Sequence, residues 1–73
     1  MKVKIRLDTI SDIAGFVSAV SGIDEEVHLI DGNNLTVSAK SILGAIYTME
    51  WNEIYCTCDR DIYSRIQNYV LNE

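Results

Sequence analysis

Side chains able to act as nucleophiles or metal ligands are few in this sequence. The only cysteines are Cys56 and Cys58, and the only histidine is His28. Two residues apart on a strand, the cysteines would point to one side with Cα atoms about 6.6 Å apart, near the upper limit for a disulfide. These residues supply too few ligands at suitable spacing for a metal site. We therefore interpret the cysteines as buried thiols and His28 as an exposed sheet residue without a catalytic partner.

Ser41 is the residue best suited to carry a covalent modification. The segment 41–48 is predicted to form a short helix, which Ser38 or Ser41 can cap, and Lys40 precedes the second of these serines. A phosphate on Ser41 would meet free backbone N–H groups and the positive end of the helix dipole. The simpler interpretation is that the hydroxyl of Ser41 only caps the helix.

The first third of the chain predicts a strand followed by a helix. Residues 2–8 alternate between apolar and mostly charged side chains, which is typical of a half-buried strand. Residues 9–21 have apolar side chains at helical spacing. Thr9 and Asp12 would form a capping box at the start of this helix. Gly22 would follow its end in the left-handed conformation.

The middle of the chain predicts a hairpin. Residues 26–31 and 35–38 alternate between the two faces of a sheet, and we expect Leu35 to face the core. Residues 31–34, Asp-Gly-Asn-Asn, have the composition of a tight turn between the two strands.

The last third predicts a strand and a helix, which completes the fold. Residues 53–58 form the strand with both cysteines inward, and a helix capped by Asp59 or Asp61 extends to about residue 71. The full order is strand, helix, strand, strand, helix, strand, helix. One apolar face per strand predicts an α+β open-faced sandwich, with a mostly antiparallel four-stranded sheet and three helices on one face. The 73 residues allow one domain, spanning 1–73.

Charge and hydropathy exclude several classes of partner. Six Lys and Arg residues against 11 Asp and Glu give a net charge of −5, which argues against binding nucleic acid through its phosphates. Lys2, Lys4 and Arg6 share one strand face, which we interpret as a solvated outer face. The apolar runs are too short to span a membrane, and the N-terminal segment alternates instead of forming a signal peptide. We therefore expect a cytoplasmic protein that binds no membrane.

Residues 39–44, Ala-Lys-Ser-Ile-Leu-Gly, begin the second helix of this element order. The segment resembles the histidine-containing phosphocarrier protein (HPr) family of the bacterial sugar phosphotransferase system. In that family a Lys or Arg, a regulatory serine, two large apolar residues and a glycine open the short second helix. The resemblance covers essentially the whole chain in element order and spacing, with a trimmed connection around residues 51–52. It implies that Ser41 matches the serine that a kinase phosphorylates in HPr of Gram-positive bacteria.

The sequence departs from the family at the phosphate-accepting histidine. In HPr a Gly-x-His-x-Arg-Pro-like segment runs into the first helix. The resemblance places the histidine position on Thr9, the arginine position on Ser11 and the proline position on Asp12. A threonine with no adjacent base is a poor nucleophile, and a carboxylate at residue 12 would lie where the phosphate binds. We expect Thr9 to act as a helix cap and not as a phosphate acceptor.

Three functions remain open from the sequence. The first is a non-catalytic regulatory or adaptor protein that acts by protein–protein binding. The second is a phosphocarrier with an unconventional acceptor, and the third is an orphan domain of HPr-like fold with an unrelated binding role. Without a nucleophile–base pair, a phosphate-binding glycine loop or a metal triad, we expect neither an enzyme nor a bound cofactor. The resemblance implies partners among phosphotransferase-system components, a serine kinase or a transcription regulator.

The second helix predicts an interaction surface. Residues 41–51 include seven large or apolar residues, yet a helix of about two turns buries only one stripe against a sheet. We expect Ile42, Leu43 and Ile46 at the centre of a partner-facing patch, and the matching residues of HPr dock partner proteins. Trp51 would lie at its rim. The patch could also be a homodimer contact, or its residues could fill gaps in a thin core.

Overall fold

The structure, a computed structural model, describes residues 1–33 and 35–71. Asn34, the last residue of the predicted turn, and residues 72–73 lie outside the described residues. In chain order the elements are β1 (Lys2–Ile5), α1 (Ile10–Ser21), β2 (Val27–Ile30), β3 (Thr36–Ser38), α2 (Ile42–Tyr47), the 3-10 turn η1 (Thr48–Glu50), β4 (Ile54–Cys58), α3 (Tyr63–Ile66) and the 3-10 turn η2 (Gln67–Tyr69).

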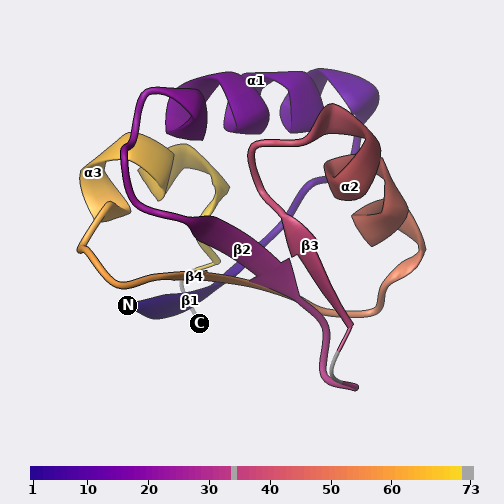
Figure 1. Ribbon diagram of the computed structural model, residues 1–73. Helices are drawn as coiled ribbons and strands as arrows, with labels where there is room; N and C mark the ends of the chain where they lie inside the picture. The colour runs from indigo at the N-terminus through magenta and orange to yellow at the C-terminus, as the bar shows by residue number, and fades with distance from the viewer. Residues whose placement is uncertain (34, 72–73) are drawn as a thin grey trace.

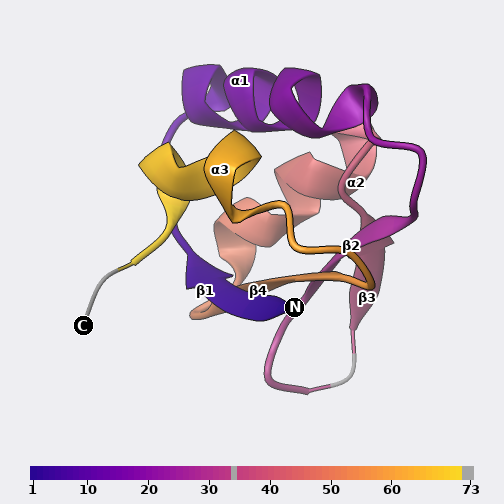
Figure 2. The ribbon, with the colours of Figure 1, turned by 90° about the vertical axis from the view of Figure 1, so that its left-hand side faces the viewer.

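The strands form one antiparallel sheet in the order β1-β4-β2-β3. Figure 1 shows α1, α2 and α3 on the same side of this sheet, with α1 extending over the other two helices. The view from the side shows the same two layers, with the other face of the sheet left open (Figure 2). The α+β open-faced sandwich predicted from the sequence is therefore confirmed.

The strand register separates the residues of the sheet into two faces. A row that faces the helices crosses the sheet through Val3, Cys56, Leu29 and Val37. The adjacent row, on the open face, crosses it through Lys2, Thr57, His28 and Ser38. On the same open face Lys2 lies over the ring of Tyr55, with its Nζ 5.0 Å from the ring centroid. The basic residues of β1 thus lie on the outer face, as the alternation predicts.

The core lies between the sheet and the helices. Its fully buried large side chains share an apolar character and come from both layers; they include Phe16, Ile13, Leu29, Ile62 and Ile66. The ring of Phe16 meets that of Tyr69 edge to face, with centroids 5.5 Å apart. This contact ties the last turn of the chain to the middle of α1.

Helix α1 begins as the sequence predicts and ends differently. Thr9 is the N-cap: its Oγ1 accepts a hydrogen bond from the backbone N–H of Asp12 at 3.0 Å, and the Asp12 carboxylate accepts one from the N–H of Thr9 at 3.2 Å. The prediction of a left-handed Gly22 is wrong, since its φ is −85°. The backbone N–H of Ile23 instead donates to the carbonyl of Val20 at 3.1 Å, a 3-10-type bond that closes the last turn of the helix without a left-handed residue.

The final helix is shorter than predicted. The α-helix α3 ends at Ile66, and the 3-10 turn η2 that follows it ends at Tyr69, whereas the prediction extended the helix to about residue 71. The backbone N–H of Arg6 donates to the carbonyl of Tyr69, and the N–H of Leu71 donates to the carbonyl of Lys4, both at 2.9 Å. These long-range bonds hold the end of the chain extended beside β1, which local helical spacing could not reveal.

The predicted inward position of Leu35 is wrong, because 56% of this residue is exposed. The carboxylate of Asp31 accepts the backbone N–H of Asn33 at 2.7 Å and that of Leu35 at 3.0 Å. Leu35 therefore still belongs to the turn, and the strand begins after it.

Two other boundaries shift by a few residues. Strand β1 ends at Ile5 instead of residue 8, although Leu7 is still buried. The N-cap position of α3 is Ile62, which makes no side-chain capping bond, whereas Asp61 accepts the N–H of Tyr63 at 3.0 Å. Asp61 thus stabilises the start of the helix, although it lies one residue before the N-cap position.

Candidate functional site

Helix α2 is built with its small residues inside and its large apolar residues outside. Ala45 is completely buried, and so is Thr48 at the end of the helix. By contrast, Leu43 is 76% exposed and Tyr47 is 67% exposed. We call the exposed apolar side chains of this helix the α2 face; they are Ile42, Leu43, Ile46 and Tyr47. The three residues predicted as the centre of an interaction patch all belong to it.

Close contact with β3 favours this arrangement, in which the small residues of α2 face the core and the large apolar ones face solvent. A Cβ added to Gly44 would lie 3.2 Å from the carbonyl oxygen of Ser38 and 3.3 Å from the Cβ of Val37. A side chain at residue 44 would push helix and strand apart by a few tenths of an ångström, so glycine favours this close approach. At the end of the helix the Thr48 hydroxyl donates to the carbonyl of Ala45 at 2.6 Å, which satisfies a buried polar group within the turn. The small residues therefore fix which side of α2 faces the core.

Ser41 is the N-cap of α2. Its Oγ accepts a hydrogen bond from the backbone N–H of Gly44 at 3.1 Å, and the residue is partly exposed. The side chain of Lys40 does not serve as its neighbouring cation, because its ammonium donates to the carbonyl of Ile23. The structure thus gives Ser41 the capping geometry, and the backbone N–H groups of α2 are the donors beside its hydroxyl.

Thr9, which the resemblance to HPr places at the phosphohistidine position, belongs to a completed helix cap. The Asp12 carboxylate accepts the backbone N–H groups of both Thr9 and Asp8, at 3.2 and 3.1 Å. It therefore fills the place at the N-terminus of α1 where an anion would otherwise bind. Ser11, which the resemblance places at the arginine position, is exposed and carries no positive charge. An incoming phosphate would meet the negative charge of Asp12.

Trp51, predicted at the rim of the patch, is partly buried and packs against the core. It lines a cleft of about 280 Å³ together with Met49, Arg6 and Glu53, at the junction of η1 and β4. Sequence reasoning left out two exposed residues of this region, Tyr47 and Met49, which are 67% and 43% exposed. The helical spacing of four residues between Leu43 and Tyr47 is the signal that could have identified the first of them.

The cysteines are both free and buried, as predicted. Desolvation, with a smaller contribution from Cys58, raises the pKa of Cys56 to about 12, so its thiol stays protonated at neutral pH. His28 is partly buried in the open-face row, between Thr57 and Ser38. Across residues 1–33 and 35–71, no three His, Cys, Asp or Glu side chains are grouped closely enough to hold a metal ion.

No protein-family model, curated protein or solved structure matches this chain. In the part of the chain that the structure describes, no helix combines the length and the apolar character needed to cross a membrane.

Proposed function

We propose that this chain is a non-catalytic regulatory or adaptor protein, related to the HPr family but without its phosphohistidine, that binds another protein through the α2 face. The observation that carries the proposal is the orientation of α2: Ala45 and the adjoining Thr48 are buried, whereas Leu43 and Tyr47 are exposed to solvent. Contiguous apolar surface on a small protein usually marks an interaction site.

The α2 face can supply enough binding energy for a specific complex. Fully burying a leucine or isoleucine side chain contributes about 1.5–3 kcal/mol relative to leaving it exposed. Ile42 and Leu43 are each more than half exposed, and so is Tyr47 on the same short helix. Side chains of this kind at the centre of an interface commonly contribute most of its affinity.

Two further observations support the relationship to HPr. The element order and the position of Ser41 as the cap of the second helix agree with what the resemblance implies. The capping box of Thr9 and Asp12 supports a function without phosphoryl transfer through the first helix. In this proposal Ser41 is the candidate phosphorylation site, and because Ile42 follows it directly, a phosphate there would change the charge at the edge of the α2 face.

Two leucines of similar type on different surfaces provide a matched test. Leu43 belongs to the α2 face, and Leu35, which is 56% exposed, belongs to the β2–β3 turn. We would compare Leu43→Asp with Leu35→Asp in pull-down from an extract of the source organism, after circular dichroism shows that both variants fold. Loss of the bound protein with Leu43→Asp but not with Leu35→Asp is the expected result. Equal binding by the two variants would contradict the proposal.

A further inference from the structure

We infer that the partner of the α2 face is a different protein that presents a basic segment, with Lys or Arg side chains flanking large apolar ones, and not a second copy of this chain. This inference rests on the proposed function, because it specifies the chemistry of the partner that the α2 face would bind. It follows from the charges that lie around the exposed apolar residues.

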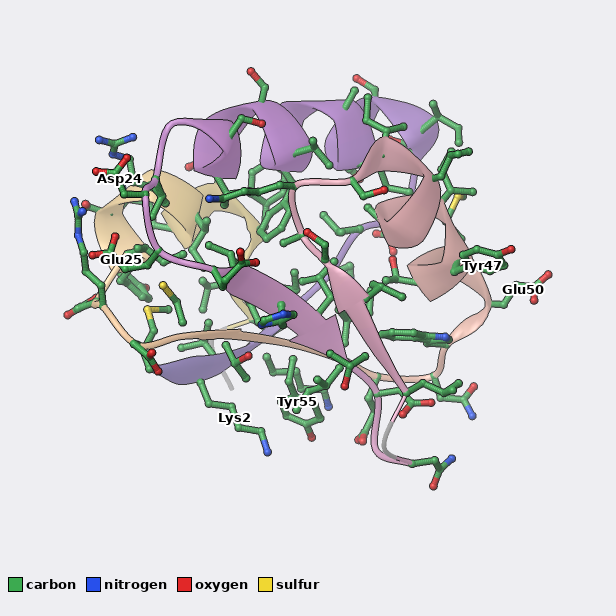
Figure 3. All side chains as sticks on the ribbon, viewed as in Figure 1. Lys2, Asp24, Glu25, Tyr47, Glu50 and Tyr55 are labelled. Carbon is green, nitrogen blue, oxygen red and sulfur yellow. The ribbon has the colours of Figure 1, made fainter. Side chains whose placement is uncertain are left out.

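Acidic side chains flank α2 at both ends of the surface. Glu50 is exposed in η1, directly after the helix, and Figure 3 shows Tyr47 and Glu50 projecting from the same side of the molecule. Asp8 and Asp12 lie at the start of α1, the helix that packs on α2 and whose first turn lies above it in Figure 1. The six residues of α2 carry no charge of their own.

Two basic side chains near the ends of this surface, Arg6 and Lys40, already have partners within the fold. The Nε of Arg6 lies 3.9 Å from the carboxylate of Asp8, and both side chains are largely exposed. The Lys40 ammonium donates to the carbonyl of Ile23. The Lys40 ammonium keeps its charge, but it lies beyond the C-terminal end of α1, whereas Asp12 lies at the N-terminal end of that helix. The pair of Arg6 and Asp8 has no net charge, and Lys4, which lines the same hollow as Glu50, pairs with Glu53 at 3.5 Å. The charges that remain at the two ends of the α2 face are therefore those of Asp12 and Glu50.

A second copy is a poor occupant of such a surface. A two-fold contact would bring the same patch of each protomer together, so that Glu50 and Asp12 would meet acidic residues again. Each protomer also carries a net charge of −5. Like charges across an interface are unfavourable, whereas basic side chains at the rim of a partner would accelerate association and favour the correct register.

The test starts from a library of random displayed peptides that is selected against the full chain and then counter-selected against Leu43→Asp. We expect the peptides that depend on Leu43 to contain large apolar residues flanked by Lys or Arg. The affinity of the best peptide is then measured for Glu50→Lys and for Asp24→Lys, an equal charge change on the opposite side of the molecule (Figure 3). Glu50→Lys should weaken binding roughly threefold or more, and Asp24→Lys should have a smaller effect.

The outcomes separate the inference from the proposed function. Loss of affinity between about 50 and 500 mM salt, together with the stronger effect of Glu50→Lys, supports the basic partner. Leu43-dependent peptides that are neutral or acidic would overturn it while leaving the docking surface in place. A dimer in sedimentation that Leu43→Asp dissociates would do the same, because the occupant would be a second copy. If no selected peptide depends on Leu43, the proposed docking function itself is wrong.

Discussion

The hydroxyl of Tyr69 fills the space that a side chain on Gly15 would need: a Cβ on Gly15 would lie 2.5 Å from the Tyr69 oxygen and 3.7 Å from the ring Cζ. Gly15 is in the middle of α1, where glycine costs about 1 kcal/mol relative to alanine. Glycine at residue 15 therefore lowers the helix propensity of α1 but leaves room for the ring of Tyr69 to pack against Phe16.

The first prediction tests this contact with a double-mutant cycle. Gly15→Ala alone should fail to stabilise the protein, because the new methyl group displaces the Tyr69 hydroxyl. In the Tyr69→Phe background the same change should raise the free energy of unfolding by about 1 kcal/mol, the gain in helix propensity. Urea denaturation of the four proteins measures the coupling. Identical effects of Gly15→Ala in the two backgrounds would show that the contact has no energetic consequence.

The second prediction concerns alkaline pH and the Cys56 thiol. Burial raises its pKa from 9.0 to about 12, so the folded state keeps a proton that the unfolded state loses above pH 9. The unfolded state then binds fewer protons, and stability falls as pH rises from 9 towards 12. Because lysines and tyrosines also titrate there, the measurement is the difference between the wild type and Cys56→Ala in thermal melts. The variant should lose stability less steeply over this range, and equal slopes would contradict the prediction.

The third prediction is that Thr9 caps a helix and accepts no phosphate. Thr9→Ala removes the acceptor for the N–H of Asp12 and should lower stability by about 1 kcal/mol, whereas Thr9→Ser keeps the hydroxyl and most of the stability. Thermal unfolding distinguishes the two variants.

Incubation with enzyme I of the phosphotransferase system and phosphoenolpyruvate provides the chemical half of that test. We expect no acid-labile phosphate on the chain, since Asp12 occupies the helix N-terminus. Labelling that His28→Ala abolishes would instead identify an unconventional phosphocarrier.

Local patterns predicted the fold well where the decisive interactions are local. The capping box of Thr9 and Asp12 follows from a three-residue spacing, and the inward cysteines of β4 follow from strict alternation. The early end of the last helix depends on backbone bonds between residues 69–71 and β1, which are far apart in sequence. The exposure of Leu35 likewise depends on how the turn closes through its hydrogen bonds.

The sequence indicated that the segment 41–51 has more apolar residues than one helix can bury, but it did not indicate the orientation of every one of them. An excess of apolar residues between 41 and 51 indicated that some had to be exposed. Which of them face solvent depends on how α2 packs against β3, with Gly44 close to the strand and Ala45 buried. The partly buried position of Trp51 against the core also depends on tertiary packing that no local spacing reports.

The last prediction tests the orientation of α2 by changing one residue on its exposed side and one on its buried side. Leu43 is 76% exposed and occupies the second position after the Ser41 cap, where a carboxylate interacts favourably with the helix dipole. Leu43→Asp should therefore leave the free energy of unfolding unchanged or raise it by up to about 1 kcal/mol. Ala45 is completely buried, so Ala45→Leu should overpack the core and lower stability by about 1–3 kcal/mol, although it adds apolar surface. Chemical denaturation of both variants measures these opposite responses; unfolding of the domain by Leu43→Asp would mean that this residue belongs to the core and that the α2 face is not available to a partner.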